Sequence, residues 1–66
     1  MNDNIESIKG CIESSEGILH NRCSQLRELI FMNEDYNPSD VIQLTNDIKL
    51  VADIIISQCN KLKSID

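Results

Sequence analysis

Apolar residues recur at alternating spacings of three and four along the second half of the chain. They occupy seven of eight consecutive positions of this repeat, which is interrupted only where Gln58 or Cys59 stands at the expected place: Val41, Leu44, Ile48, Val51, Ile55, Leu62 and Ile65. This spacing places them on one face of an α-helix, whereas a β-strand would require strict alternation. Four more apolar residues lie beside this stripe: Ile42, Leu50, Ile54 and Ile56. The pattern predicts a helix over residues 38–64 whose apolar surface is wider than one neighbouring helix covers.

The first half carries a similar but weaker stripe, in which Ser15 stands where an apolar residue is expected. Its members are Ile5, Ile8, Ile12, Leu19, Cys23, Leu26 and Ile30. The pattern predicts a helix over about residues 3–32. Gly10 and Gly17 each lower helix propensity by about 1 kcal/mol relative to alanine, so we expect its first half to be less stable. The spacing of Gly10, Ser14 and Gly17 also suits close approach of another helix, although a weakly formed helix is the simpler interpretation.

The two periodic segments are separated by residues 33–37, which form a turn rich in Asn, Asp and Glu. Helix initiation is well marked there, because Asn37 can cap the second helix and Pro38 suits its first position. Asp40 follows three residues after the cap, where an acidic side chain is favourable. These signals predict one all-α domain over residues 1–66, an antiparallel two-helix hairpin.

A chain of 66 residues can hold only one small core. Its aromatic residues are Phe31 and Tyr36, so the core must come from aliphatic side chains. An isolated hairpin leaves part of its apolar surface open, and small scaffolds without disulfides or metals often close that surface by associating. We therefore expect the hairpin either to dimerise into a four-helix bundle or to dock on a larger protein.

The net charge of -5 opposes binding to phosphate backbones and argues against a nucleic acid partner. No apolar run approaches the ~20 residues that cross a bilayer, and the acidic start Met1–Asn4 does not resemble a secretory signal. These features predict a cytoplasmic protein with no membrane association. Two helices are also too small to enclose a substrate pocket, so a partner must supply much of any active site.

Three cysteines, Cys11, Cys23 and Cys59, form no CxxC pair, and we interpret them as reduced thiols that pack as small apolar side chains. His20 and Cys23 are spaced to share a metal ion, with Cys11 or Cys59 as a third ligand, but structural zinc normally uses four ligands in paired spacings. We therefore expect no metal. A nucleophilic Cys23 activated by His20 lacks an orienting third group.

The segment Thr45–Lys49 brings a hydroxyl, an amide, a carboxylate and an ammonium group onto about one and a half helical turns. Ile48 belongs to the apolar stripe, while Thr45 and Lys49 share a flank at i and i+4. Such a polar flank can enter the active site of another protein, where an amide or carboxylate positions a water molecule and an ammonium group pairs with phosphate.

The stretch Tyr36–Lys49 resembles the small sporulation-control aspartyl-phosphate phosphatases of spore-forming bacteria. Members of that family are two-helix hairpins of similar size, with a short turn that ends in an aromatic or aliphatic residue. Their second helix carries the signature Ser-Gln-Glu-Leu-Asp, preceded by an apolar pair and a leucine. Here the pair is Val41–Ile42, the leucine is Leu44, and residues 45–49 read Thr-Asn-Asp-Ile-Lys. The resemblance covers about residues 26–55 without a gap.

The resemblance implies that the second helix docks on a phosphorylated response regulator, promotes hydrolysis of its aspartyl phosphate and so negatively regulates sporulation. It implies that Asn46 or Asp47 orients the attacking water and that Thr45, Lys49 and Tyr36 contact the regulator. The regulator would supply the phosphoaspartate and its magnesium, so the chain needs no cofactor of its own.

Lys49 departs from the family pattern, which has a carboxylate at this position, whereas the four preceding residues keep its chemical type. An ammonium group contacts phosphate but cannot act as a carboxylate. Two alternatives follow: the chain binds the regulator without dephosphorylating it, or it acts on a different target. A further alternative is a non-catalytic helical interaction module, either a self-associating hairpin or an inhibitor of a protein partner.

Overall fold

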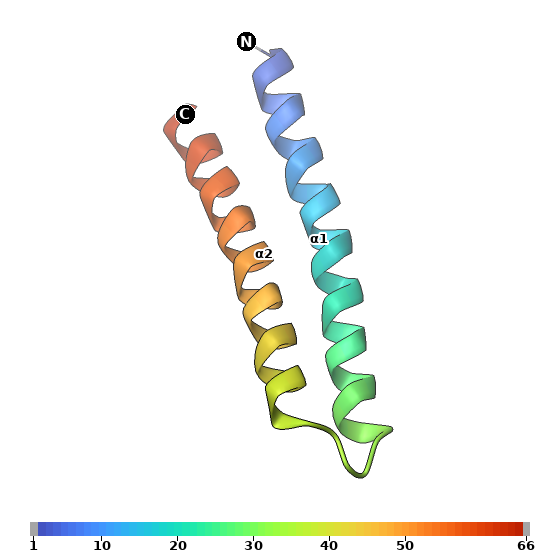
Figure 1. Ribbon diagram of the computed structural model, residues 1–66. Helices are drawn as coiled ribbons and strands as arrows, with labels where there is room; N and C mark the ends of the chain where they lie inside the picture. Colours follow the sequence, from blue (N-terminus) through green and yellow to red (C-terminus); the bar gives the residue numbers. More distant parts are fainter. Residues whose placement is uncertain (1, 66) are drawn as a thin grey trace.

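The protein is a hairpin of two long antiparallel helices (Figure 1). The computed structural model describes residues 2–65, in which α1 spans Asn2–Phe31 and α2 spans Pro38–Ile65. The all-α hairpin predicted from the sequence is confirmed. Helix α1 ends one residue earlier than expected and α2 runs one residue further. Helix α1 also continues through Gly10 and Gly17, so its first half is helical in spite of its low propensity.

The start of α2 is fixed by Asn37, as the sequence predicts. Its Oδ1 accepts a hydrogen bond from the backbone N–H of Ser39 at 2.9 Å. Its backbone carbonyl accepts hydrogen bonds from the N–H groups of Asp40 at 3.0 Å and Val41 at 3.3 Å. Pro38 has no N–H to satisfy and is preorganised for the first helical position. The helix therefore has a defined first residue.

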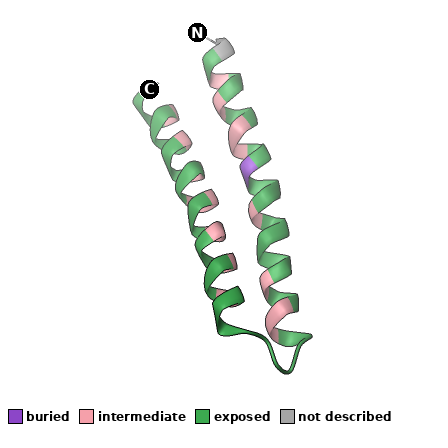
Figure 2. Cartoon of the chain, viewed as in Figure 1, coloured by how far each residue is buried: buried purple, intermediate pink, exposed green. Residues whose placement is uncertain are grey.

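The two helices meet along a seam of half-buried side chains, drawn in pink along their facing sides in Figure 2. From α2 the seam takes Val41, Leu44, Ile48, Val51, Ile55, Gln58 and Leu62. From α1 it takes Ile5, Ile8, Ile12, Ser15, Leu19, Leu26, Leu29 and Ile30. Apart from Ile30, both sets follow a seven-residue repeat, which keeps two long helices in contact along their length. Ile65 continues the repeat but is 45% exposed, because it lies in the last turn of α2.

Ser15 is the most buried residue of the seam, with 7% of its surface exposed, and among residues 4–65 no hydrophobic side chain is buried. A small residue at this position lets the two backbones approach, whereas a larger one would hold them apart. Two helices can cover only one stripe of each other, and the sides of every aliphatic seam residue remain open to water.

The prediction that Cys23 belongs to the apolar stripe is wrong, because Cys23 is exposed. The seven-residue repeat of α1 runs through Arg22 instead. The side chain of Arg22 extends to the surface, where its Nη1 donates a hydrogen bond to Oε1 of Gln25 at 3.3 Å. Long cationic side chains commonly reach water in this way from positions beside apolar surface. Cys59 is also exposed, and of the three thiols only Cys11 is half-buried, so the interpretation of all three as packed apolar groups fails.

The hairpin is extended and has a large surface for its mass. The Cα trace measures 51 × 15 × 11 Å with a radius of gyration of 15.2 Å, against about 11 Å for a compact domain of this length. Its accessible surface of 5307 Å² exceeds by about 1,000 Å² the value expected for a compact monomer of its mass. Several large hydrophobic side chains, each at least 41% exposed, contribute to this surface: Ile18, Phe31, Met32, Tyr36, Ile42, Leu50, Ile54, Ile56 and Ile65.

Neither α1 nor α2, over their described residues, has a stretch that is both long and apolar enough to traverse a lipid bilayer.

Replacing Gly10 or Gly17 with alanine is expected to stabilise the hairpin by about 0.5–1 kcal/mol per site. A methyl group at either position would meet no atom within 4 Å, and alanine removes the entropic cost of ordering glycine in a helix. Thermal unfolding followed by circular dichroism measures the change. A loss of stability would show that these positions contact something other than solvent, as close approach of another helix requires.

Replacing Asn37 with alanine is expected to lower the free energy of unfolding by about 1 kcal/mol, because the N–H of Ser39 loses its side-chain acceptor. Asn33→Ala is the matched control. The Asn33 side chain donates a longer hydrogen bond of 3.5 Å to the carbonyl of Leu29 at the end of α1. Urea unfolding compares the two, and an equal loss for both variants would contradict the capping role of Asn37.

Candidate docking site on helix α2

The segment Thr45–Lys49 lies in the second and third turns of α2, directly after the capped start of the helix. Thr45 is exposed, and its hydroxyl donates a hydrogen bond of 2.7 Å to the carbonyl of Val41. Because its proton is held by the preceding turn, the oxygen presents its lone pairs outward. Thr45 is therefore placed to accept a hydrogen bond from a partner rather than to donate one.

Asn46 lies on the side of α2 opposite the seam. Residues at intervals of four form a continuous line on a helix surface, and here that line contains Ile42, Asn46, Leu50 and Ile54, which we call the α2 row. All four are exposed; Ile42 is 61% and Leu50 62% accessible. An exposed amide with a large aliphatic side chain one turn before it and another one turn after it is unusual on a solvated face. Exposed apolar surface around a polar group is typical of protein interfaces.

The five-residue unit does not present its polar groups on one surface. Lys49 follows Asn46 by three residues, so these two exposed side chains are neighbours. Asp47 is half-buried and borders the seam on the other flank of α2. Successive helical residues are rotated by about 100°, which directs Asp47 and Lys49 to different sides of the helix. Asn46 and Lys49 can therefore contact one ligand together, while Asp47 cannot join them without a partner that wraps around the helix.

Tyr36 belongs to the turn, two residues before α2, and is 41% exposed. Eight residues separate Pro38 from Asn46, about 12 Å along the helix axis. Tyr36 is thus on the same half of the molecule as Asn46 but outside its immediate surroundings, and a contact of both with one partner requires an extended interface.

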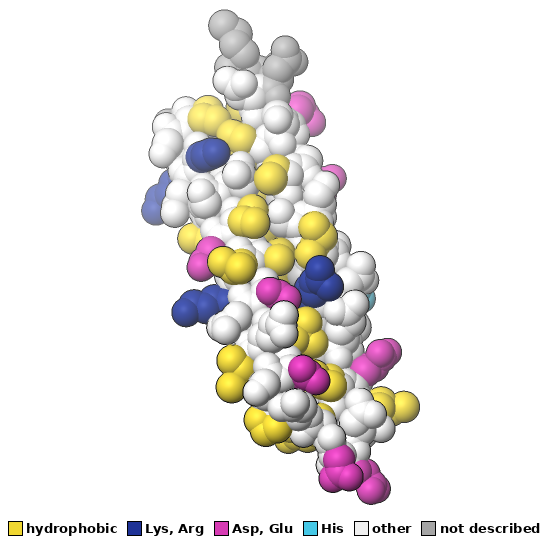
Figure 3. Space-filling model, viewed as in Figure 1, with side chains coloured by type: hydrophobic (Ala, Val, Ile, Leu, Met, Phe, Trp, Pro, Cys, Tyr) yellow, Lys and Arg dark blue, Asp and Glu magenta, His cyan; other side chains and the backbone are white. Residues whose placement is uncertain are grey.

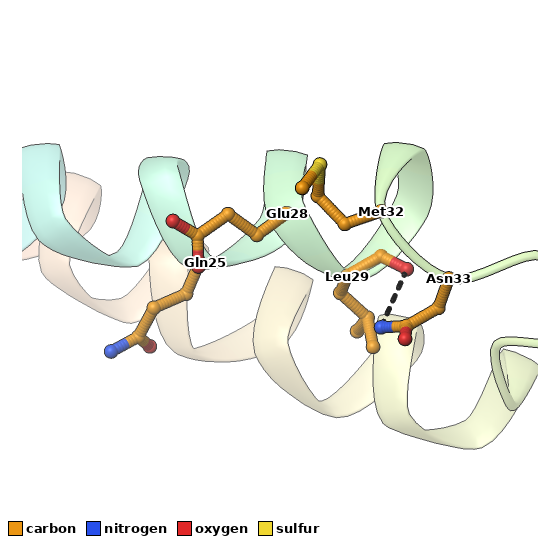
Figure 4. A pocket seen from close by; sticks show the side chains of 5 residues that line it. All are labelled: Gln25, Glu28, Leu29, Met32 and Asn33. Atoms are coloured by element: carbon orange, nitrogen blue, oxygen red, sulfur yellow. Dashed lines mark hydrogen bonds between the residues drawn. The ribbon is translucent and has the colours of Figure 1, made fainter.

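The geometry adds an open hollow at the end of α1 that the sequence patterns did not indicate. It has a volume of about 530 Å³ and is lined by Gln25, Glu28, Leu29, Met32 and Asn33 (Figure 4). The hydrogen bond from Asn33 to the Leu29 carbonyl closes one side of it. The spacing of Gln25, Glu28 and Met32 at three and four is the sequence signal that could have revealed this surface.

The described residues 4–65 bring together no group of three His, Cys, Asp or Glu side chains that could hold a metal ion. Among its exposed side chains, α2 presents an amide, an ammonium group and a hydroxyl oxygen at Asn46, Lys49 and Thr45. Such groups orient a water molecule or pair with an anion, but they need a second protein to supply the reacting bond. Comparison with protein-family models, curated proteins and solved structures finds no match to this chain.

Proposed function

We propose that this chain is a small regulatory protein that docks through α2 on a phosphorylated response regulator and promotes hydrolysis of its aspartyl phosphate. In this role it negatively regulates sporulation and acts in the cytoplasm. The proposal combines the residue pattern of Tyr36–Lys49 with the exposure of α2. The observation that carries it is the α2 row, in which Asn46 lies between the exposed side chains of Ile42 and Leu50.

The α2 row suits docking because it offers apolar contact area together with a polar group. Ile42, Leu50 and Ile54 are between 46% and 62% exposed, so a partner that covers them removes apolar surface from water without first unfolding the hairpin. Asn46 would then be enclosed by its aliphatic neighbours. A hydrogen bond made by its amide is stronger in that setting than in water, because the surrounding medium is less polar.

In the proposed reaction, a water oxygen forms a bond to phosphorus while the bond from phosphorus to the aspartyl oxygen breaks. The products are inorganic phosphate and the free carboxylate of the regulator. The carbonyl oxygen of Asn46 accepts a hydrogen bond from the attacking water and orients it in line with the bond that breaks. Lys49, on the same surface, donates to a phosphate oxygen and offsets its negative charge. The regulator contributes the phosphoaspartate and its magnesium.

The exposed position of Asn46 favours it over the half-buried Asp47 as the residue that orients water. Lys49 takes the place of the family's carboxylate but faces the same surface as Asn46, so its ammonium group suits recognition of phosphate.

Asn46→Ala is expected to lower the rate of phosphate release from the phosphorylated regulator by about 10²-fold, the loss that misplacement of a reacting group by about 1 Å can cause. Phosphate release is followed with a coupled assay at stoichiometric protein. Asn60→Ala is the matched control, because Asn60 is an exposed asparagine two seven-residue repeats further along the same side of α2. Asp47→Ala is expected to have a smaller effect than Asn46→Ala.

No acceleration of phosphate release by the wild-type protein would exclude the catalytic step. Equal activity of the Asn46→Ala and wild-type proteins, with the helical circular dichroism signal unchanged, would exclude Asn46 as the residue that orients water.

Lys49→Ala is expected to weaken binding to the phosphorylated regulator about 10-fold and to leave binding to the unphosphorylated form unchanged, since a charge-assisted hydrogen bond contributes about 1.5 kcal/mol or more. Lys63→Ala gives the same change in net charge two repeats away on the same side of α2. Isothermal titration with both forms of the regulator makes the comparison. An equal loss of affinity for the two forms would show that Lys49 does not contact the phosphate.

A second candidate function is a self-associating hairpin, a non-catalytic interaction module. Among residues 4–65 no hydrophobic side chain is buried, and the excess surface of about 1,000 Å² is close to the ~800 Å² per partner of a standard interface. The charges of α2 favour this helix as the contact between two copies. Residues 38–65 carry three acidic and three basic side chains, whereas α1 and the turn are both acidic. Pairing through α2 would thus avoid repulsion between like charges.

If the chain forms a dimer through α2, sedimentation equilibrium is expected to give twice the 7.5 kDa mass of one chain. Leu50→Asp is then expected to yield a monomer, because it would bury an unpaired charge in the contact. Leu50 is 62% exposed, so this change leaves the seam intact. By contrast, Val51→Asp or Ile55→Asp would place a charge between the helices and oppose both hairpin formation and association. Ile18→Asp, at a 48% exposed position on α1, is the control. A monomer at 100 μM wild-type protein would rule out this candidate.

A further inference from the structure

We propose that the turn end of the hairpin is a second docking surface, which binds an apolar pocket bordered by Lys and Arg side chains on the response regulator. This inference rests on the proposed function and extends it from the α2 row to the other exposed apolar surface of the molecule. We call this surface the tip; it comprises Phe31, Met32, Tyr36 and the hollow at the end of α1.

The tip holds the largest exposed apolar side chains of the chain. Phe31 is 77% and Met32 78% exposed, higher fractions than those of the other large exposed apolar residues. Phe31 and Tyr36 are also the two aromatic residues of the sequence. Aromatic and methionine side chains are enriched at the centres of protein interfaces, where one or two of them often provide most of the binding energy. Both aromatic residues of this chain therefore lie outside the seam between the helices.

The hollow next to Met32 suits a basic side chain. Among its lining residues, Leu29 and Met32 offer apolar contact to the aliphatic part of a lysine or arginine, and Gln25 and Glu28 offer oxygens to its charged end. Glu28 precedes Phe31 by three residues and Met32 by four, so it lies between the hollow and the aromatic ring on the surface of α1. A partner residue in the hollow is therefore adjacent to a pocket that receives Phe31.

The acidic charge around the tip also favours a partner with basic side chains. Residues 27–40 include four acidic side chains, Glu28, Glu34, Asp35 and Asp40, against the single basic side chain of Arg27. Figure 3 shows acidic and hydrophobic side chains next to one another at this end of the molecule. Opposite charges at the rim of an interface accelerate association and orient the partners, while an acidic partner would be repelled.

One interface of ordinary size can include both the tip and the α2 row. Ile42, the first residue of the row, is 61% exposed and lies in the second turn after the cap, near the end of the molecule that holds the tip. In the bound state the tip fixes the orientation of α2, and Asn46 and Lys49 then reach the phosphorylated site. The tip residues are thus positioning residues rather than catalytic ones.

The test measures the affinity for a regulator held in its phosphorylated form by beryllofluoride, which permits binding without hydrolysis. The double variant Phe31→Ser, Met32→Ser is expected to weaken binding by about 10- to 100-fold, the range for loss of interface anchors. Both side chains are outside the seam, so the hairpin should remain folded, which circular dichroism checks. Ile56→Ser, another exposed apolar position, is expected to change affinity by less than about twofold.

A second pair of variants tests the charge. The first double variant, at the turn end, is Glu34→Lys, Asp35→Lys. The second, near the other end of α1, is Glu6→Lys, Glu13→Lys, and it alters the net charge by the same amount. At an ionic strength of about 0.1 M we expect about a 10-fold loss of affinity for the tip pair and about a twofold change for the distant pair, since contacts beyond a Debye length of about 10 Å are screened.

The outcomes separate this inference from the proposed function. If the tip variants bind like wild type while Asn46→Ala abolishes hydrolysis, the tip is not a docking surface and the proposed function stands. If the regulator binds in a tip-dependent way but is not dephosphorylated, the tip inference stands and the catalytic step is wrong. Absence of binding by the wild-type protein overturns both.

Discussion

The central constraint on this protein is that two helices can cover only one stripe of each other. Each helix commits one side to the seam, and even there the aliphatic side chains are half-buried at best. Hydrophobic stabilisation scales with the area removed from water, so a hairpin of this kind gains less per residue than a compact domain. The exposed apolar residues of α2 and of the turn end are a consequence of the same geometry. The surface available for association and the limited apolar burial within the hairpin have one cause.

Within that constraint, the apolar repeat of α2 decides the arrangement of functional groups. Val41, Leu44 and Ile48 are half-buried against α1, and their packing fixes the rotation of the helix about its axis. Asn46, which lies between Leu44 and Ile48 in the sequence, is therefore directed away from α1. Asn37 and Pro38 define where α2 begins, and the apolar seam defines which of its side chains remain open to a partner.

The sequence was sufficient to predict the hairpin, the position of the turn and the residues of α2 that face α1. These features follow from periodicity and from strong local signals at Asn37 and Pro38, which do not depend on tertiary context. The role of Cys23 could not be predicted, since positions 22 and 23 both continue a spacing of three and four, and their burial depends on the exact rotation of α1. The division of Thr45–Lys49 between two flanks was also missed, although it follows from helical geometry. The hollow near Met32 was also missed, although the spacing of Gln25, Glu28 and Met32 places their side chains on one side of α1.

Both chain ends of the described segment, Asn2 and Ile65, lie together at the end of the hairpin opposite the turn (Figure 1). The molecule is 51 Å long, so this places them several nanometres from Phe31 and Tyr36. A fluorophore, an affinity tag or a surface tether attached at either end would leave the turn and the first half of α2 open to solvent. Immobilisation by one terminus would also present every molecule with the same end outward, which makes this hairpin suited to single-molecule and surface-based measurements of partner capture.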